Sequence, residues 1–334
     1  MSDRITLDYG SGGMASHRLI TSLFLRHLGN SYLEGLNDAA CVPTGSRTAV
    51  STDSFTVDPV FFPGGNIGSL SVHGTVNDVA MLGARPRYLT CGFLIEEGLP
   101  YRDLELIVAS MAEAARVAQV QIVAGDTKVV HKGAADKIFI NTTGLGELLL
   151  EEPLSGDGAR EGDAILVSGN LGDHGLAVMA AREGLSFHTP VQSDSDCLCH
   201  MAADLVQSIP EIDVLRDPTR GGLAAALNEI AYQSGRDLLV REEDIPVDPA
   251  VDEGCSLLGL DPLYLANEGK LICILPSDRA EEGLRIMRRH EQGTNAAWVG
   301  QVAESGRGRV VLETRIGGKR LLQMPEGVQL PRIC

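Results

Sequence analysis

Hydrophobic and polar positions in the first 150 residues follow two different periods. Four short runs rich in apolar or β-branched residues predict strands. Between the second and third runs, residues 104–119 place Leu104, Ile107, Val108 and Met111 on one face of a helix. The expected strands are residues 48–52, 88–95, 120–124 and 137–143.

The same kinds of pattern restart in the second half, after a turn-rich stretch at 151–162. The expected strands are 164–168, 237–240, 270–275, 297–302 and 310–314, and the expected helices are 175–183, 222–233 and 280–290. The pattern therefore predicts two α/β or α+β domains, at residues 1–150 and 151–320. Residues 321–334 lack a period and contain two prolines and a glycine, so we expect a mobile tail.

Composition restricts the class of partner. The formal net charge of −17 argues against nucleic acid or an anionic membrane surface as a partner. The sequence has no apolar run of about 18 residues and no signal-peptide pattern, so we expect a cytoplasmic protein. Seven scattered cysteines fit reduced thiols, and Cys197-Leu198-Cys199-His200 lacks a second Cys/His pair at zinc spacing.

Four aspartates stand at the ends of apolar segments in the first half. Aspartate weakens helix and strand interiors, so packing explains these positions poorly. Converging carboxylates repel one another unless cations lie between them, and Mg²⁺ prefers oxygen ligands and bridges to phosphates. The alternative for each one is a turn or N-cap residue. The candidate metal ligands are Asp38, Asp53, Asp78 and Asp126.

Glycine-rich turns before expected helices can cradle phosphate through backbone N–H groups. The first contains Gly10, Gly12 and Gly13; others lie at 169–172 and 217–222. A structural turn is the alternative for each. The sequence has neither a Walker A motif nor a G-x-G-x-x-G fingerprint, which disfavours an ordinary P-loop or Rossmann enzyme.

The chain ends with a thiol, at Cys334 in Pro331-Arg332-Ile333-Cys334. About 13 extended residues at roughly 3.3–3.6 Å each span some 40 Å, so a thiol on a mobile tail can reach a distant pocket as a tethered nucleophile. An incidental terminal cysteine is the alternative. A prenylation signal does not fit, because it requires its cysteine four residues from the end.

Eight motifs carry a family resemblance over essentially the whole chain. They are Tyr9-Gly10-Ser11-Gly12-Gly13, Asn37-Asp38-Ala39-Ala40, Thr52-Asp53-Ser54-Phe55, the run from Gly74 to Ala84 around Asn77-Asp78, Ala124-Gly125-Asp126-Thr127-Lys128, Arg216-Asp217-Pro218-Thr219-Arg220-Gly221-Gly222, Ala266-Asn267-Glu268-Gly269-Lys270, and the terminal Pro-Arg-Ile-Cys. The sequence resembles the HypE family of hydrogenase maturation proteins. That family belongs to the superfamily of aminoimidazole ribonucleotide synthetase, thiamine-monophosphate kinase and selenophosphate synthetase. Tyr9 stands where many relatives have a histidine.

The resemblance implies an aminoimidazole ribonucleotide synthetase-like fold of two α/β domains, each a mixed sheet packed with helices, and a homodimer formed through the first domain. It implies a carbamoyl dehydratase that uses ATP and Mg²⁺ to convert a thiocarboxamide on Cys334 to a thiocyanate. Cyanide would then serve the iron of nickel–iron hydrogenase. The implied partners are the carbamoyltransferase HypF and a HypC–HypD iron scaffold complex.

The resemblance also assigns site residues. Glu268 is the expected base, and Lys128 is a second candidate that could instead hold a phosphate; a solvated turn residue is the alternative for Glu268. Besides the three glycines of the first turn, the expected ATP- and phosphate-binding residues are Asn77, Gly125, Thr127, Asp217, Thr219 and Arg220.

Two other functions explain part of the pattern. A small-molecule kinase or phosphate synthetase of the same superfamily would use the aspartates and glycines but leave Cys334 idle. A carrier without catalysis would use Cys334 but not the full set of carboxylates.

Overall fold

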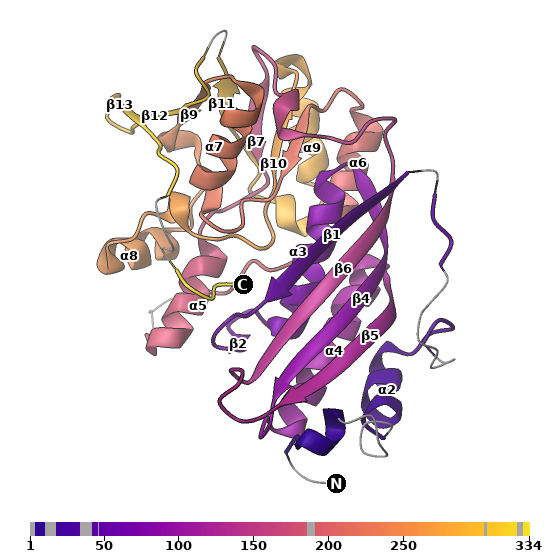
Figure 1. The fold of residues 1–334 in the computed structure, drawn as a ribbon. Helices are drawn as coiled ribbons and strands as arrows, with labels where there is room; N and C mark the ends of the chain where they lie inside the picture. Colours follow the sequence, from indigo (N-terminus) through magenta and orange to yellow (C-terminus); the bar gives the residue numbers. More distant parts are fainter. Residues whose placement is uncertain are drawn as a thin grey trace.

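The computed structural model describes residues 4–10, 18–33, 42–45, 47–185, 191–303, 306–325 and 330–334. Its strands form two main mixed sheets, one from each half of the chain, with helices packed against both (Figure 1). This arrangement is the mixed α/β class that the sequence predicts. In the described ranges we find no helix that combines the length and the apolar character needed to cross a bilayer.

The first sheet has four strands in the order β1-β6-β4-β5. Strands β4 and β5 are parallel, and the other neighbouring pairs are antiparallel. The strands are β1 (Thr48–Phe55), β4 (Ala84–Glu96), β5 (Gln121–Val130) and β6 (Ile138–Leu148). A short hairpin of β2 (Phe61–Phe62) and β3 (Gly65–Asn66) follows β1.

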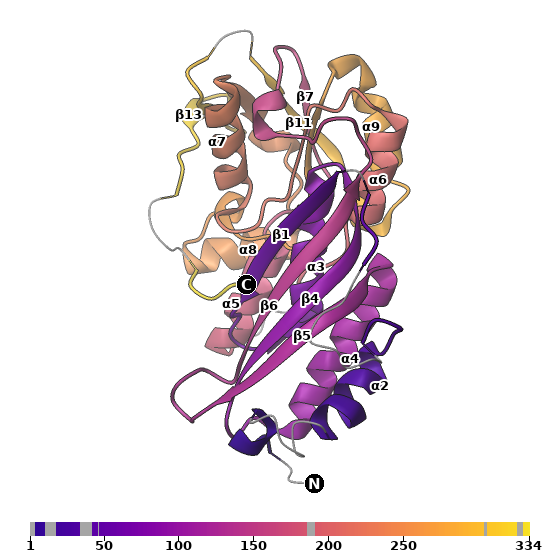
Figure 2. The ribbon, with the colours of Figure 1, turned by 45° about the vertical axis from the view of Figure 1, so that its right-hand side comes forward.

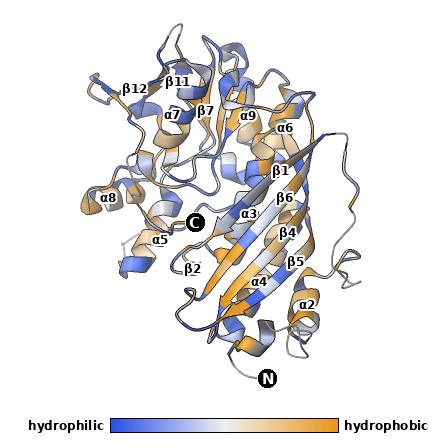
Figure 3. Cartoon of the chain, viewed as in Figure 1, coloured by the Kyte–Doolittle hydropathy of each residue, from blue (hydrophilic) through white to orange (hydrophobic). Residues whose placement is uncertain are grey.

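The two faces of this sheet have different surroundings. Helices α3 (Ile67–Met81) and α4 (Tyr101–Ala118) cover the inner face, and alternate residues such as Ile138 and Ile140 are buried beneath them. The residues between them, such as Phe139, are only partly buried. No described element covers the outer face, and β6 and β4 carry apolar segments (Figures 1 and 3).

Helix α3 lies between the first sheet and the second half of the chain. It starts at Asn66, whose side chain accepts a hydrogen bond from Gly68 N–H at 2.8 Å and forms a capping box with Ser69. Thirteen of its 15 residues are buried. An all-round buried helix has no polar stripe, so hydrophobic periodicity gives no signal for it, and we did not predict this element.

The second sheet has seven strands in the order β13-β12-β9-β11-β7-β10-β8. All neighbouring pairs are antiparallel except β12 and β9. Its strands are β7 (Ala164–Val167), β8 (Val214–Arg216), β9 (Leu238–Arg241), β10 (Ile272–Leu275), β11 (Ala297–Val302), β12 (Val310–Glu313) and β13 (Lys319–Leu321). The helices of this half are α5 (Asp173–Glu183), α6 (Cys199–Ser208), α7 (Gly222–Ser234), α8 (Pro249–Leu258) and α9 (Ala280–Met287).

Helices lie on both faces of the central strands in this sheet. Ile165 and Val167 of β7 share a core with α7, whereas Ala164 and Leu166 share a core with α6 and α9. Strands buried on both faces read as continuous apolar runs rather than alternating ones. The core of α6 and α9 continues into α3 and α4, so apolar packing crosses the domain boundary that we predict at residue 150.

Shorter helical turns complete the described chain. They are η1 (Leu7–Gly10), the π-helical η2 (Ile20–Phe24), α2 (Leu25–Leu28), η3 (Gly156–Gly158), η4 (Glu242–Asp244), η5 (Pro262–Tyr264), η6 (Ser277–Arg279) and η7 (Glu291–Gly293).

Two aspartates that we expected at strand ends lie inside strands. Strand β1 continues through Asp53 to Phe55, and β5 continues through Gly125 and Asp126 to Val130. The prediction that β5 ends at Ala124 was wrong because Gly125 pairs with Cys91 of β4 rather than starting a turn. A Cβ atom at position 125 would lie 2.8 Å from the carbonyl oxygen of Cys91, so close backbone packing explains the glycine.

Candidate active site

The end of the chain is docked against the segment that follows β1 (Figure 2). The N–H and the hydroxyl of Thr56 donate to the main-chain oxygen of Cys334 at 3.0 and 3.2 Å. Asp58 N–H donates to the carbonyl of Arg332 at 3.2 Å, and Ile333 is buried with 4% of its surface exposed. Residues 330–334 therefore have a defined position, and movement of the tail away from it remains a prediction.

Histidine 174 of α5 holds the next peptide of the tail. Its Nε2–H donates to the carbonyl oxygen of Ile333 at 2.8 Å, and its Nδ1 accepts from the hydroxyl of Ser193 at 2.7 Å. Complete burial lowers the pKa of His174, which keeps the ring neutral with one donor and one acceptor nitrogen. The ring also contacts Phe62 edge to face, at 5.4 Å between centroids.

Arg182 and the side-chain contacts of Arg332 itself fix the position of Arg332 in the tail. Arg182 of α5 donates from Nε to the carbonyl of Asp58 at 2.8 Å and from Nη2 to the carbonyl of Arg332 at 2.7 Å. Arg332 itself has a φ of 52°, pairs with Asp136 and lies 5.7 Å from the ring centre of Phe139. We call the contacts of Thr56, His174, Arg182 and Asp136 with the last three residues the tail clamp.

The thiol of Cys334 lies next to a cation and is subject to the charge of a buried acid. Arg220, on the loop between β8 and α7, places Nη1 3.6 Å from the Sγ atom. Burial, followed by the charge of Glu268, raises the pKa of the Cys334 thiol to about 12, although Arg220 opposes the rise. The docked thiol is therefore neutral at physiological pH.

Glu268 is positioned by its own main chain. Its N–H donates to Asp194 Oδ1 at 3.1 Å, and its carbonyl accepts from Asn77 Nδ2 at 3.4 Å. The residue is 3% exposed, and its Oε1 atom has no hydrogen-bond partner among the described residues. Burial, followed by the charges of Asp217, Asp194 and Asp78, raises the pKa of Glu268 well above its usual value.

Three further carboxylates converge on the same region. They are Asp53 of β1, Asp78 of α3 and Asp217 after β8. Burial and the charges of Asp217 and Asp53 raise the pKa of Asp78 to about 8, although Ser51 donates to its Oδ2 at 2.7 Å. Burial also raises the pKa of Asp217 to about 6, and its buried Oδ2 has no partner in the described structure. Such crowded carboxylates suit a hard cation.

A cavity of about 430 Å³ opens beside these carboxylates. It lies between the C-terminal part of α3, the loop after β8 and helix α7, and Asp78, Asp217, Thr219 and Arg220 line it. Cavities of roughly 300–1,000 Å³ are typical of small-molecule sites. The cavity therefore gives a phosphate-bearing ligand room next to candidate cation ligands and a guanidinium.

The predicted site residues on β5 lie far from Asp53 within this chain. Strands β1 and β5 are at opposite edges of the sheet. Gly125 lies at the same level as Asp53 across the four strands, so three interstrand spacings of roughly 4.8 Å, about 14 Å in total, separate the two residues. Asp126 and Lys128 are exposed and pair with outer-face residues of β4, whereas Asp53 is on the inner face. Thr127 pairs with buried Phe93. One chain does not bring these residues to Asp53.

Asn77 makes contacts within the protein that occupy its side chain. Its Oδ1 accepts from Leu198 N–H at 2.8 Å, and its Nδ2 donates to the carbonyl of Asp196 at 2.9 Å. We expected Asn77 to bind ATP or phosphate. Its position, 1% exposed, instead makes it a link between α3 and the segments that carry Asp196 and Glu268.

The first glycine turn is mostly outside the described structure. Gly10 is the last residue of η1. Asp38, Gly12 and Gly13 lie outside the described residues, so their predicted roles stay predictions.

The sequence analysis missed the tail clamp and a buried ion pair near it. Lys270 Nζ lies 3.3 Å from Asp194 Oδ2, and both side chains are nearly inaccessible. His174 and Arg182 follow the glycine turn at 169–172, and Arg182 lies in the helix predicted at 175–183. These signals indicate a helix, but they do not show which side chains face the tail.

Comparison with known proteins gives matches over both halves. The family models described as AIR synthase related protein, N-terminal domain and C-terminal domain, match residues 36–148 and 160–313. Carbamoyl dehydratase HypE of Cupriavidus necator is 51% identical over 335 residues, which covers 100% of this chain and 95% of that protein.

Solved structures give the same relationship. A crystal structure of hydrogenase maturation protein HypE in complex with ATP has a TM-score of 0.96 at 60% identity and covers 98% of this chain and 99% of that chain. A chain in a crystal structure of a HypE–HypF complex has a TM-score of 0.81 at 48% identity and covers 92% and 99%. Thiamine monophosphate kinase of Aquifex aeolicus, at 19% identity and a TM-score of 0.63, shares the fold alone.

The two matched domains and the carboxylate-lined cavity define a protein of the AIR synthase related class. Within that class, the full-length identity to curated carbamoyl dehydratases decides the family. The chain belongs to the HypE family of hydrogenase maturation proteins, which confirms the resemblance that the sequence motifs carry.

Proposed function

We propose that this chain uses ATP to dehydrate a thiocarboxamide on Cys334 to a thiocyanate, which supplies cyanide for the iron of nickel–iron hydrogenase. The observation that carries this function is the position of the terminal thiol, 3.6 Å from Arg220 and within the electrostatic influence of buried Glu268. The curated name carbamoyl dehydratase, given to relatives that match the whole chain, supports the same reaction.

The chemistry must remove one oxygen and two protons from Cys–S–C(=O)NH₂. An amide oxygen is a poor leaving group, but transfer of the γ-phosphoryl group of ATP to it creates a phosphate leaving group. Loss of the N–H protons then forms the C≡N bond as the C–O bond breaks. Thiocarboxamide and ATP give thiocyanate, ADP and phosphate, with one proton released to solvent.

Glu268 is our candidate for the group that takes a proton from nitrogen. A carboxyl whose pKa is raised toward neutrality is a stronger base when ionised, which suits general base catalysis. Arg220 lies beside the sulfur and is placed to stabilise negative charge on the oxygen that receives phosphate. Cys334 carries the reacting group throughout.

The crowded carboxylates fit a magnesium ion. Asp53, Asp78 and Asp217 offer oxygen ligands, and one buried oxygen of Asp217 lacks a partner in the described structure. When bound, Mg²⁺ would neutralise charge on the triphosphate. A relative solved with ATP supports nucleotide binding, and we place its phosphates in the adjoining cavity near Thr219 and Arg220.

Two partners follow from the need to load and unload the tail. The solved HypE–HypF complex supports the carbamoyltransferase HypF as the donor of the carbamoyl group. Cys334 is partly buried in the docked position, so we propose that residues 330–334 leave the clamp to reach HypF. The same released tail would then deliver cyanide to a HypC–HypD iron scaffold.

A homodimer would give Asp126 and Lys128 a function. Both side chains are on the uncovered outer face of the first sheet. Partly exposed Leu94 and Phe139 lie beside Lys128 in the pairing register, and Leu145 lies further along β6 on the same face. We propose that two copies pair through this face. Asp126, Lys128, or both would then serve the site of the other copy, as metal ligand and as base or phosphate ligand.

We also propose residues 1–150 and 151–320 as the two domains, followed by the tail at 321–334. A cytoplasmic location is our proposal as well. The six cysteines of the described ranges are free thiols, which fits a reducing compartment.

The alternatives account for less of the structure. A small-molecule kinase would use the carboxylates and the cavity, but it would give no role to the docked Cys334 or to the clamp that holds it. A carrier without catalysis would use the thiol, but it would not need converging carboxylates next to that thiol.

Intact-protein mass spectrometry tests the proposal. After incubation with HypF, carbamoyl phosphate and ATP, peptide mapping should find a gain of about 43 Da on Cys334 that becomes about 25 Da with Mg-ATP, as expected for the two adducts of this thiol. Cys334→Ala should show neither adduct, and Cys255→Ser is the matched control at a buried cysteine of α8. An unmodified Cys334 in the presence of active HypF would overturn the proposal in favour of the kinase.

A further inference from the structure

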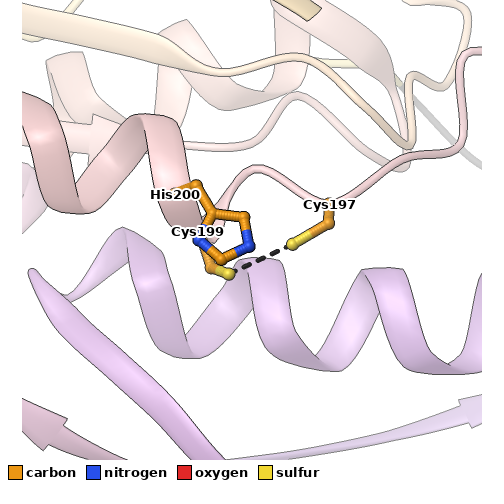
Figure 4. A group of neighbouring side chains, drawn as sticks. All are labelled: Cys197, Cys199 and His200. Carbon is orange, nitrogen blue, oxygen red and sulfur yellow. Dashed lines mark hydrogen bonds between the residues drawn. The ribbon is translucent and has the colours of Figure 1, made fainter. Parts of the chain in front are cut away.

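A second group of metal-binding side chains lies at the start of α6. Cys197, Cys199 and His200 offer two sulfurs and one ring nitrogen, all within 4.8 Å of one another (Figure 4). The two sulfurs are 3.1 Å apart. We propose that this cluster, which we call the thiol site, binds one thiophilic divalent cation such as Zn²⁺. It involves none of the residues proposed for catalysis.

The imidazole of His200 is held in the way that metal-binding histidines usually are. Its Nε2–H donates to the carbonyl of Val117 at 2.8 Å. Because a carbonyl oxygen only accepts, this contact fixes the neutral tautomer and leaves the lone pair on Nδ1. Metal-ligating histidines commonly donate their other N–H to a backbone carbonyl or a carboxylate.

The position of the thiol site at the end of α4 favours a cation. Val117 and Ala118 are the last two residues of this 18-residue helix, and the Sγ atom of Cys199 lies 3.7 Å from the carbonyl of Ala118. The carbonyl end of a helix carries partial negative charge, which attracts cations and opposes unpaired thiolates. Among the charged side chains, Asp196 adds to the negative potential and Arg85 opposes it.

The two thiols contact each other, with a hydrogen bond between the Cys197 and Cys199 sulfurs at 3.1 Å. Both sulfurs are buried, but His200 is partly exposed and provides a side from which an ion can enter. A thiolate is the form that binds metal.

The coordination would be three protein ligands with a water in the fourth position. Tetrahedral Zn²⁺ with Zn–S bonds of about 2.3 Å separates two sulfurs by roughly 3.8 Å. Binding would therefore move the Cys197 and Cys199 side chains apart by less than about 1 Å, a change that side-chain rotation can provide. The missing second Cys/His pair, which argued against zinc in the sequence, is not needed for a site with one open position.

The thiol site also has a connection to the candidate active site. Leu198, between the two cysteines, donates its N–H to Asn77 Oδ1 at 2.8 Å. Asn77 in turn donates to the carbonyls of Asp196 and Glu268. A cation on residues 197–200 would restrain the segment that supports Glu268. This consequence rests on the proposed function, whereas cation binding does not.

Cobalt spectroscopy tests the site in the full-length chain. Reduced protein carrying Cys334→Ala is titrated with Co²⁺ in excess Mg²⁺. The substitution removes the thiol of the tail, and the Mg²⁺ keeps Co²⁺ from the carboxylates. We expect one equivalent to give near-ultraviolet thiolate-to-cobalt absorption that Zn²⁺ removes. His200→Gln leaves both thiols in place and should weaken Co²⁺ affinity by about tenfold or more, since even outer-shell partners contribute that much.

Two variants and one control separate the possible results. Cys197→Ser with Cys199→Ser should abolish the absorption, whereas Cys255→Ser should retain it with one thiol fewer. Thermal melting verifies the fold of each variant, and His200→Gln remains informative if the double variant does not fold. Absence of the absorption in the reduced parent, its persistence in the double variant, or unchanged affinity in His200→Gln would overturn the proposal. Loss of catalysis with metal binding intact would concern the proposed function alone.

Discussion

Arg220 and Cys334 are 114 residues apart in sequence, and a guanidinium nitrogen of the first lies 3.6 Å from the sulfur of the second. The same thiol is subject to the charge of Glu268, which acts in the opposite direction on its pKa. A terminal residue thus meets a cation and an acid supplied by two different loops of the second half. This relationship makes the reactivity of Cys334 depend on whether the tail is docked.

The reactivity of Cys334 should increase when the clamp is weakened. Arg182→Met removes the two hydrogen bonds to the carbonyls of Asp58 and Arg332, so the undocked population should rise. The docked thiol has a pKa of about 12, whereas an exposed thiol ionises near its usual value of about 8.5. We expect alkylation of Cys334 by iodoacetamide at pH 8 to accelerate by roughly tenfold, measured by mass spectrometry of the terminal peptide.

The pH dependence of docking follows from the same shift. Docking raises the pKa of Cys334, so it is favoured fully below the usual thiol pKa and weakens as pH rises from there toward about 12. Arg116→Met, which removes a surface pair with Glu113 on α4, is the matched control and should leave the alkylation rate unchanged. Equal rates in Arg182→Met and the parent would contradict a docked tail in solution.

Glu268→Gln should separate loading from dehydration. The amide has nearly the same shape but cannot accept a proton as a carboxylate does, so we expect dehydration to slow by about 10²–10⁴-fold. HypF should still load the tail, and the adduct of about 43 Da should accumulate on Cys334 without conversion to that of about 25 Da. Conversion at the parental rate would assign proton removal to another group.

Stability gives an independent readout for the same variant. Burial and repulsion from Asp217, Asp194 and Asp78 raise the pKa of Glu268, so its ionised form is unfavourable in the fold. The melting temperature of Glu268→Gln should therefore equal or exceed that of the parent at pH 8. A marked decrease in melting temperature would mean that the carboxyl makes a stabilising contact. The dehydration rate of Glu268→Asp, which keeps a carboxyl group, would then be measured for comparison.

Periodicity predicted some helices and missed others, including α6 and α8. The helix expected at 104–119 is α4, Tyr101–Ala118, because one face is solvated and its polar residues mark the period. Helix α3 left no such mark, since it is buried between the first sheet and the second half. Asp53 and Asp126 lie inside strands, because pairing with neighbouring strands overrides the weak local preference of aspartate.

The sequence motifs indicated most of the groups that converge, but not what holds them. Asp53, Asp78, Asp217, Glu268 and Cys334 were all candidates, and the structure brings them into electrostatic contact. The clamp was not predictable, because His174 and Arg182 bind main-chain carbonyls about 150 residues away. Such contacts depend on the position of the backbone, which no local spacing records.

Removal of a carboxylate should cancel the effect of magnesium. Mg²⁺ between Asp53, Asp78 and Asp217 would relieve their repulsion, so the parent should melt a few degrees higher with Mg²⁺ than with a chelator, as a ligand of the folded state requires. Asp78→Asn should melt at nearly the same temperature in both conditions and lose at least about 100-fold in ATP-dependent dehydration.

Its control is an acidic residue outside the site. Asp204 of α6 pairs with His290 on the surface, so Asp204→Asn should keep the parental response to Mg²⁺. An undiminished magnesium shift in Asp78→Asn would remove Asp78 from the set of metal ligands.

Mixing two inactive variants should reveal whether Asp126 acts across a dimer. Asp78→Asn disables the inner-face site of its own chain, whereas Asp126→Asn would disable the site of its partner. In a mixed dimer one of the two sites then has both aspartates. Random exchange of equal amounts makes about half of the dimers mixed, so about a quarter of parental dehydration should be restored. Each variant alone should stay inactive, and turnover is measured as formation of the thiocyanate on Cys334.

Disruption of the outer face provides the control for this exchange. Leu145→Lys places a charge on the outer face of β6, and it should convert the proposed dimer to a monomer in light scattering with little change in melting temperature. Combined with Asp126→Asn, it should prevent the restoration. If Asp126 instead serves its own chain, no mixed dimer has an intact site, because each chain lacks one of its two aspartates, and mixing restores nothing.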